Sequence, residues 1–247
     1  MSRMYGGWAR AMGGWLFAAV GCGGTTVIPP SEAPKPSTAA ESLVCDRPVE
    51  NFAQGAVGQF PAGWKVRDDG QEGLGAQTYQ IAELDGERVL HGTWQQETVT
   101  IGLVIENWDL NQHPVLRYRW RAVKLPPGAD ETKDGLNDTG AAVYAIWKVG
   151  FPMYVRGIKY AWSSTLPTGT RTSKRLKHDQ MLVMESGETN LDTWQTVEVD
   201  VQAHALTFFE RDGGVGNPNG IALMTDADST KTAAEAYFAD FELCHYE

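Results

Sequence analysis

The chain has 247 residues and a formal net charge of −10, with 31 acidic side chains against 21 lysines and arginines. A net charge this negative argues against binding to nucleic acid and against electrostatic adhesion to anionic lipid, both of which need a basic surface, although it does not exclude an acidic ligand bound by a local cationic patch. The length is enough for one well-packed domain behind an N-terminal leader.

The first 21 residues have the pattern of an export signal. Arg3 and Arg10 are their only charged side chains, and the apolar run 11–21 is too short to cross a bilayer as a helix. The run ends in Ala-Val-Gly before Cys22, which resembles the lipobox of bacterial lipoproteins. We therefore expect a signal peptide over residues 1–21 and lipid on Cys22. The alternative is an ordinary signal peptide beside a chance cysteine.

Residues 22–44 are small, polar and proline-bearing, so they bury too little apolar surface to fold. Such a segment is typical of a tether between a lipid anchor and a folded domain. Two or more acyl chains on one cysteine hold a protein stably at a membrane. We expect an exported protein anchored in the bacterial cell envelope, on the outer membrane or a periplasm-facing membrane, with one domain over residues 45–247.

Cys45 opens this domain and Cys244 lies near its end. An even pair of cysteines in an oxidising compartment predicts a disulfide, provided that the first and last strands are neighbours. The alternative is two buried free thiols.

Short alternating segments separated by Gly, Asp, Asn and Pro predict an all-β domain. The link Asp85-Gly86 between two such segments is a strong hairpin signal. A short helix is expected only at 203–211, before a loop at 212–220. The expected strands are 79–84, 87–91, 98–106, 115–124, 141–149, 153–163, 180–185, 195–201, 221–225 and 236–244. This pattern predicts a two-sheet antiparallel β-sandwich, jelly-roll-like in type.

Three arginines, Arg117, Arg119 and Arg121, alternate with apolar residues in the strand 115–124, so all three point to its outer face. Guanidinium groups in a row suit a ligand bearing carboxylates, sulfates or phosphates. The alternative is a structural ladder of ion pairs with acidic neighbours such as Glu198 and Asp200.

Asp226 and Asp228 stand two residues apart, a spacing that suits a shared calcium ion, although the loop lacks the glycine and distal glutamate of an EF-hand. Asp138 lies in another acidic turn, and aspartates are also ordinary turn residues. Asp138 and Asp226 are in addition candidates for the acid and base of glycoside cleavage, which depends on their separation.

Seven tryptophans follow the signal peptide, a surplus that suits sugar binding. Trp120 and Trp147 lie in strong strand patterns and are expected in the core. Trp94, Trp108 and Trp162 are the candidates for exposed platforms. The five histidines show no metal-binding spacing, and no nucleophile, phosphate-loop or dinucleotide motif is present.

Several motifs occur in order between Phe60 and Phe241. They are Phe60–Trp64, Leu116–Arg121, Leu125–Asp130, Asn137–Asp138, Tyr160–Trp162, Pro167–Gly169, Ser186–Gly187 and Ala222–Asp228. In these motifs the chain resembles the bacterial family called domain of unknown function 3047. The resemblance implies that Asp138, Trp162, Asp226 and Asp228 belong to the family pattern, from which this chain departs over 197–211. The opening Pro-Ala-Gly-Trp turn is also similar to that of jelly-roll carbohydrate-binding modules.

These observations favour non-catalytic binding of a glycan or similar polar ligand, with calcium as the one candidate cofactor. The expected ligand-binding residues are Arg117, Arg119, Arg121, Asp138, Trp162, Asp226 and Asp228. One alternative is a glycosidase or lyase that uses the aspartates. Another is a structural envelope protein that binds other proteins.

Overall fold

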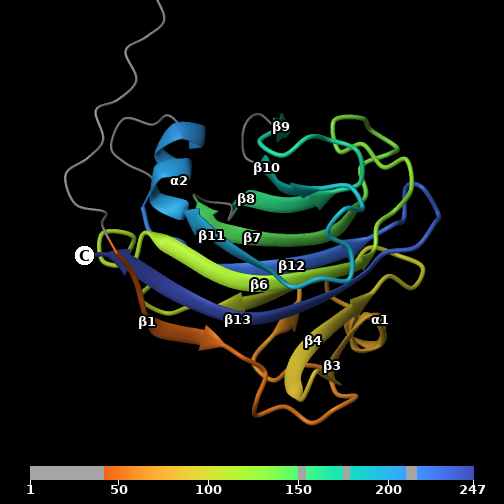
Figure 1. Cartoon of the computed structure of the whole chain (residues 1–247), viewed down its shortest axis with the longest axis horizontal. Coiled ribbons are helices and arrows are strands. Elements are labelled where there is room, and N and C mark those ends of the chain that lie inside the picture. Colours follow the sequence, from red (N-terminus) through yellow and green to blue (C-terminus); the bar gives the residue numbers. More distant parts are fainter. Residues whose placement is uncertain (1–41, 150–153, 175–178, 210–215) are drawn as a thin grey trace, which may run out of the picture. The chain divides into compact units, whose positions relative to one another are not determined.

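The computed structural model describes residues 42–149, 154–174, 179–209 and 216–247, which fold as two stacked β-sheets (Figure 1). The expected signal peptide, the expected lipidation site Cys22 and most of the expected tether lie outside the described residues. Among the described helices, none is both long and apolar enough to span a membrane.

The first sheet has six strands, and all its pairs are antiparallel. Along the main path its strands are β11 (Gln195–Asp200), β6 (Val115–Lys124), β13 (Glu235–Tyr246), β4 (Glu87–Thr93) and β3 (Tyr79–Leu84), and β1 (Leu43–Glu50) also pairs with β13. Asp85 and Gly86 link β3 to β4, both with positive φ, as a tight two-residue hairpin requires. This hairpin confirms the sequence prediction.

The second sheet has seven strands. They are, in order, β2 (Lys65–Val66), β5 (Thr100–Val104), β12 (Gly220–Asp226), β7 (Thr139–Val149), β8 (Tyr154–Ser163), β10 (Asp179–Ser186) and β9 (Arg171–Lys174). β8 and β10 run parallel, contrary to the expectation of a purely antiparallel sandwich. Between these two strands in the chain lies β9, which pairs antiparallel with β10, so β10 follows β9 as a hairpin partner and not β8.

The predicted strands are all present, and the fold is a jelly-roll-like β-sandwich. The sequence prediction missed β1, β2 and β9, and β1 takes up Leu43 and Val44 from the segment expected as tether. It also missed the helix α1 (Glu72–Thr78), whose two glycines are poor helix formers. The expected helix is present as α2 (Val201–Phe209).

The core lies between the two sheets and is rich in aromatic rings. Tyr118 and Trp120 of β6 are fully buried there, and Trp147 of β7 is 2 % exposed, which confirms the core prediction for both tryptophans. The side chain of Asp200 accepts a hydrogen bond from the N–H of Ala203 and so caps α2. α2 then turns an apolar face, including Phe208 and Phe209, into the same core.

Cys45 and Cys244 form the predicted disulfide. They are directly paired residues of β1 and β13, at a Cα–Cα distance of 4.0 Å. The bond joins the first strand to the last across 199 positions of sequence. It therefore fixes the pairing register of β1 on β13.

Candidate functional site

The outer face of the seven-stranded sheet, turned away from the core, has small residues at its centre. Residues of β12, β7, β8 and β10 that alternate with the core-facing ones form this surface, which we call the β7–β8 face. Its residues are Ala142, Tyr144, Gly157, Lys159, Ala161, Met181, Ala222 and Met224. Tyr144 is partly exposed and the other side chains of this face are buried; at one end Ala161 and Met181 pack with Val183 and Leu166 in a second small hydrophobic cluster.

A β-bulge brings polar side chains onto one end of this face. Met224 pairs with Ala142, but Asp226 pairs with Thr139, so β7 has one more residue than β12 in this interval. Because a bulge re-aims the side chains that follow it, Thr139 comes to the same side as Lys159. Lys159 Nζ donates to Thr139 Oγ1 at 2.6 Å, although both residues are buried.

Glu131 closes this polar end from the loop before β7. Its carboxylate accepts hydrogen bonds from Thr139 Oγ1 at 3.0 Å and from Ser163 Oγ at 2.6 Å. The side chain is 1 % exposed, so Lys159, Thr139 and Ser163 supply the polar surroundings that a buried carboxylate needs. The sequence offered no signal for Glu131, because its loop only becomes buried when it folds over β7 and β8.

Tyr144 lies at the centre of the face and is partly exposed. Its hydroxyl donates to Met224 Sδ at 3.5 Å. Burial, and next the carboxylate of Asp226, raise the pKa of Tyr144, so its hydroxyl is a neutral donor at physiological pH. Arg67 and Asp179 also lie close enough to influence that pKa. Groups of both charges thus influence the hydroxyl of this ring.

Asp138, Asp226 and Asp228 converge beside the polar end, each offering an oxygen within 4.8 Å of the others. Asp138 is fully buried, and its carboxylate accepts from the N–H groups of Ser229 and Thr230 and from Thr230 Oγ1. Although burial raises the pKa of Asp138, these hydrogen bonds hold it below its ordinary value. Asp138 thus organises the turn after β12.

Asp226 differs from Asp138 in its electrostatics. Burial raises the pKa of Asp226, and the neighbouring carboxylates of Asp228 and Asp138 raise it further, against hydrogen bonds from Thr98 Oγ1 and the N–H of Asp228. Two ligands of one calcium ion lie at most about 5 Å apart, because each bond is about 2.3–2.6 Å long. The spacing of the three aspartates therefore meets the geometric requirement for a shared cation.

The arginine ladder lies on the other side of the molecule, on the outer face of the six-stranded sheet. The protein's own carboxylates pair with all three guanidinium groups. The pairs are Arg117 with Glu242, Arg119 with Asp240 and Glu87, and Arg121 with Asp192 and Asp85. An anionic ligand would have to displace one of these pairs.

The expected acidic partners of the ladder are not the ones used. Glu198 lies directly across from Arg117 in the β11–β6 register, yet Arg117 donates to Glu242 on the other neighbouring strand. Asp200 caps α2 instead. The choice of partner depends on β13 lying next to β6, which sequence alternation does not reveal.

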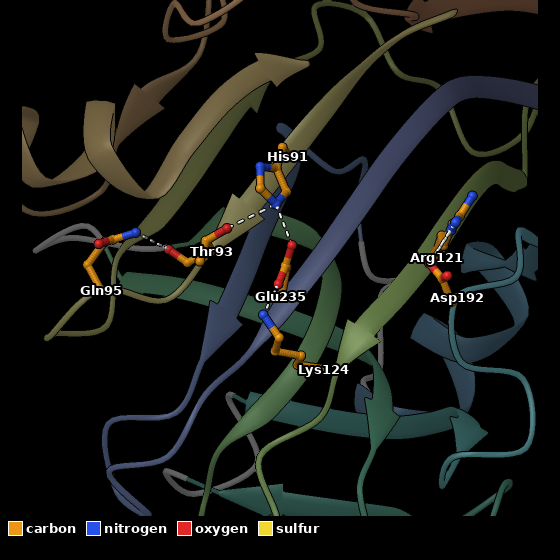
Figure 2. Close-up of polar contacts among 7 residues, drawn as sticks. All are labelled: His91, Thr93, Gln95, Arg121, Lys124, Asp192 and Glu235. Atoms are coloured by element: carbon orange, nitrogen blue, oxygen red, sulfur yellow. Dashed lines mark hydrogen bonds and ion pairs between the residues drawn. The ribbon is translucent and has the colours of Figure 1, made fainter. Parts of the chain in front are cut away.

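Figure 2 shows a second group of polar side chains on the six-stranded sheet, together with the Arg121–Asp192 pair of the arginine ladder. His91 Nε2 lies 3.1 Å from Glu235 Oε1 and 3.0 Å from Thr93 Oγ1, and Lys124 pairs with the other oxygen of Glu235. Although burial raises the pKa of Glu235, Lys124 and His91 hold it below its ordinary value. This group, like the ladder, is internally satisfied.

Two of the tryptophans expected at the surface are buried. Trp162 is fully buried, and its Nε1 donates to the carbonyl of Gly187 at 3.0 Å. Trp108 is 1 % exposed. The prediction of Trp162 as an exposed platform is wrong because it faces Trp120 across the core, at a ring separation of 5.7 Å. Trp194, which the sequence did not single out, is partly exposed and stacks on Arg119.

A family model described as "Protein of unknown function (DUF3047)" matches residues 63–242. The chain belongs to this family. The match spans both sheets, including the β7–β8 face and the three aspartates. No curated protein matches the chain.

The chain is also similar to solved structures, at low sequence identity and low TM-score. A family 11 carbohydrate-binding module from Clostridium thermocellum has 9 % identity and a TM-score of 0.40, covering 83 % of this chain and 96 % of that one. Endoglucanase 3 of family GH12 from Trichoderma harzianum has 11 % identity and a TM-score of 0.39, covering 85 % and 100 %. The xyloglucanase domain of NopAA from Sinorhizobium fredii has 12 % identity and a TM-score of 0.37, covering 85 % and 100 %.

Proposed function

We propose that this protein binds a glycan on the β7–β8 face, from a position in the bacterial envelope fixed by lipid on Cys22. The observation that carries the proposal is the surrounding of Tyr144. A neutral, partly exposed phenol lies beside the small residues of this face, and the charges of Asp226, Arg67 and Asp179 influence its pKa. A sugar ring offers C–H groups for the aromatic ring and hydroxyls for both donors and acceptors, so it matches this mixture.

The positions of the carboxylates near this face favour glycan binding over glycan cleavage. A glycosidase needs two carboxyl groups that reach the scissile bond from opposite sides. Asp138 and Glu131 are both buried, and groups of the protein bond to their oxygens. Asp226 is itself buried, and its nearest partner, Asp228, comes from the same turn, so the two carboxylates do not reach a bound sugar from opposite sides.

The disulfide supports the export that the proposal requires. Such bonds persist in oxidising compartments and are rare in the cytosol. Lipid attachment is tested by labelling cells with palmitate: the parent protein should take up label and the Cys22→Ser variant should not. Equal labelling of both would refute the anchor.

Glycan binding is tested with the full chain carrying Cys22→Ser, by affinity electrophoresis and calorimetry against cell-wall and extracellular polysaccharides. We expect Tyr144→Ala and Arg67→Ala each to weaken binding about tenfold, which corresponds to about 1.4 kcal/mol. The matched control is Tyr237→Ala, since Tyr237 is a partly exposed tyrosine stacked on His91 on the opposite sheet.

Two results would contradict this proposal. One is that none of the polysaccharides binds. The other is that Tyr237→Ala weakens binding as much as Tyr144→Ala, which would place the ligand elsewhere. Release of new reducing ends during the assay would instead show an enzyme.

A further inference from the structure

Three side chains with metal-binding atoms meet beside the disulfide, away from the β7–β8 face. Asp46 comes from β1, His113 from the turn before β6, and His245 from the end of β13. His113 Nε2 lies 3.1 Å from Asp46 Oδ1, and His245 Nδ1 lies 3.5 Å from the same oxygen. All three ligand atoms lie within 4.8 Å of one another.

The disulfide positions two of these residues. Cys45 and Cys244 are paired, and each is followed directly by a member of the group, Asp46 or His245. The register of β1 on β13 shifts between Cys45 and Arg47, so Asp46 is the extra residue of an irregularity in the ladder. Since such irregularities re-aim side chains, Asp46 is free to turn toward the histidines.

His113 is held by its backbone. Its N–H donates to the carbonyl of Asp109 at 2.8 Å, and its own carbonyl accepts from Nε1 of Trp108 at 3.1 Å. Trp108 is buried, so this turn is fixed to the core. The rings of His113 and His245 cross nearly at right angles, 85°, with centroids 5.9 Å apart. This arrangement lets a nitrogen of each ring approach Asp46.

We propose that Asp46, His113 and His245 bind one zinc ion, or a similar divalent transition metal, with a fourth position open to water. Imidazole nitrogens and a carboxylate are the ligand types that zinc prefers. Ligands bonded tetrahedrally to zinc at about 2.0–2.1 Å are about 3.3 Å apart. The two distances to Asp46, 3.1 and 3.5 Å, bracket that value.

The surroundings of the group fit such a site. His245 Nε2, the ring nitrogen turned away from Asp46, lies 3.7 Å from a carboxylate oxygen of Glu247. A carboxylate behind a metal-bound histidine is a common arrangement, because it orients the ring and raises its basicity. The side chains are 53 % exposed for Asp46, 15 % for His113 and 27 % for His245, so an ion can enter and a coordination position can stay open.

The test uses the full chain carrying Cys22→Ser, titrated with Zn²⁺ by calorimetry and with Co²⁺ by visible absorption. We expect one ion per chain and the intense visible bands of a tetrahedral cobalt site. His113→Ala and His245→Ala should each weaken zinc binding by at least about tenfold, more than Glu247→Gln, which removes only the charge of the carboxylate behind His245. Asp46→Asn replaces an exposed carboxylate with an amide of the same size, so it should leave the fold in place and weaken zinc binding by removing the charged ligand.

The matched control is His91→Ala. His91 also lies 3.1 Å from a carboxylate, that of Glu235, but it belongs to neither metal-capable group of the described residues. This variant should bind zinc as the parent does. The proposal is overturned if the parent binds no zinc, or if the three ligand variants bind it as tightly as the parent and the His91→Ala control.

Discussion

Breaking the Cys45–Cys244 bond should strongly destabilise this domain. The bond closes a loop of 199 positions. In the chain-entropy model, cross-linking a loop of this size lowers the entropy of the unfolded chain enough to stabilise the fold by about 5 kcal/mol at 25 °C. Folded domains are stable by only about 5–15 kcal/mol, so this single bond represents a large share.

The perturbation is Cys45→Ala with Cys244→Ala, made in the Cys22→Ser background so that no thiol remains among the three cysteines of the chain. Urea unfolding followed by tryptophan fluorescence measures the change. We expect a loss of about 3–5 kcal/mol and a melting temperature lower by about 6–20 °C. The slope of the transition should also rise, because the unfolded chain without its cross-link exposes more surface.

A second measurement separates the bond from the mutated side chains. Reducing the Cys22→Ser protein with dithiothreitol should shift its urea midpoint about as far as the double substitution does. The reasoning is refuted if the double variant unfolds at the same urea concentration as its parent. The same variant should also bind zinc more weakly, since β1 then no longer holds Asp46 in register with His245.

Two further predictions concern the buried residues. Asp226→Asn should stabilise the protein at pH 7 in the presence of a chelator, because the raised pKa of Asp226 means that its charged form lowers the free energy of unfolding. This loss disappears as the pH falls toward 3.8, where the carboxyl is protonated in the folded state and increasingly so in the unfolded state. The urea midpoints of the variant and the parent should therefore converge in acid. If added calcium reverses the order of the two proteins, the aspartates hold a cation; an unstable Asn variant in chelator would contradict the electrostatic argument. Trp162→Ala should cost about 3–5 kcal/mol in the same unfolding assay, because it empties a fully buried site between the sheets, and a cost under about 1 kcal/mol would contradict that burial.

Alternation along single strands was enough to predict the fold class. In β6 it correctly placed Tyr118 and Trp120 in the core and the three arginines outside, because neighbouring side chains of a strand point to opposite faces. The Asp85–Gly86 hairpin and the pairing of Cys45 with Cys244 were likewise predictable. The first follows from the backbone needs of a two-residue turn, the second from an even number of cysteines at the two ends of one domain.

The alternation of apolar and polar residues along a strand does not reveal which strands are neighbours. The candidate sites depend on this strand order. Trp162 occupies a regular position in β8, but only the opposing sheet buries it against Trp120. The buried Glu131 and Lys159 read as ordinary polar positions of a loop and a strand. They become a network only through the bulge in β7 and the folding of the loop over it.

The sequence by itself determined the β-sandwich class and the membership of a bacterial family. It predicted the cross-link on the condition that the first and last strands are neighbours, and the export leader stays a prediction. The tertiary structure decided which side chains meet. Asp46, His113 and His245 come from three separate parts of the chain, and Asp138 and Asp226 from two. Strand pairing places them within a few ångströms because contacts between sheets and across edges depend on topology, which local patterns of sequence do not encode.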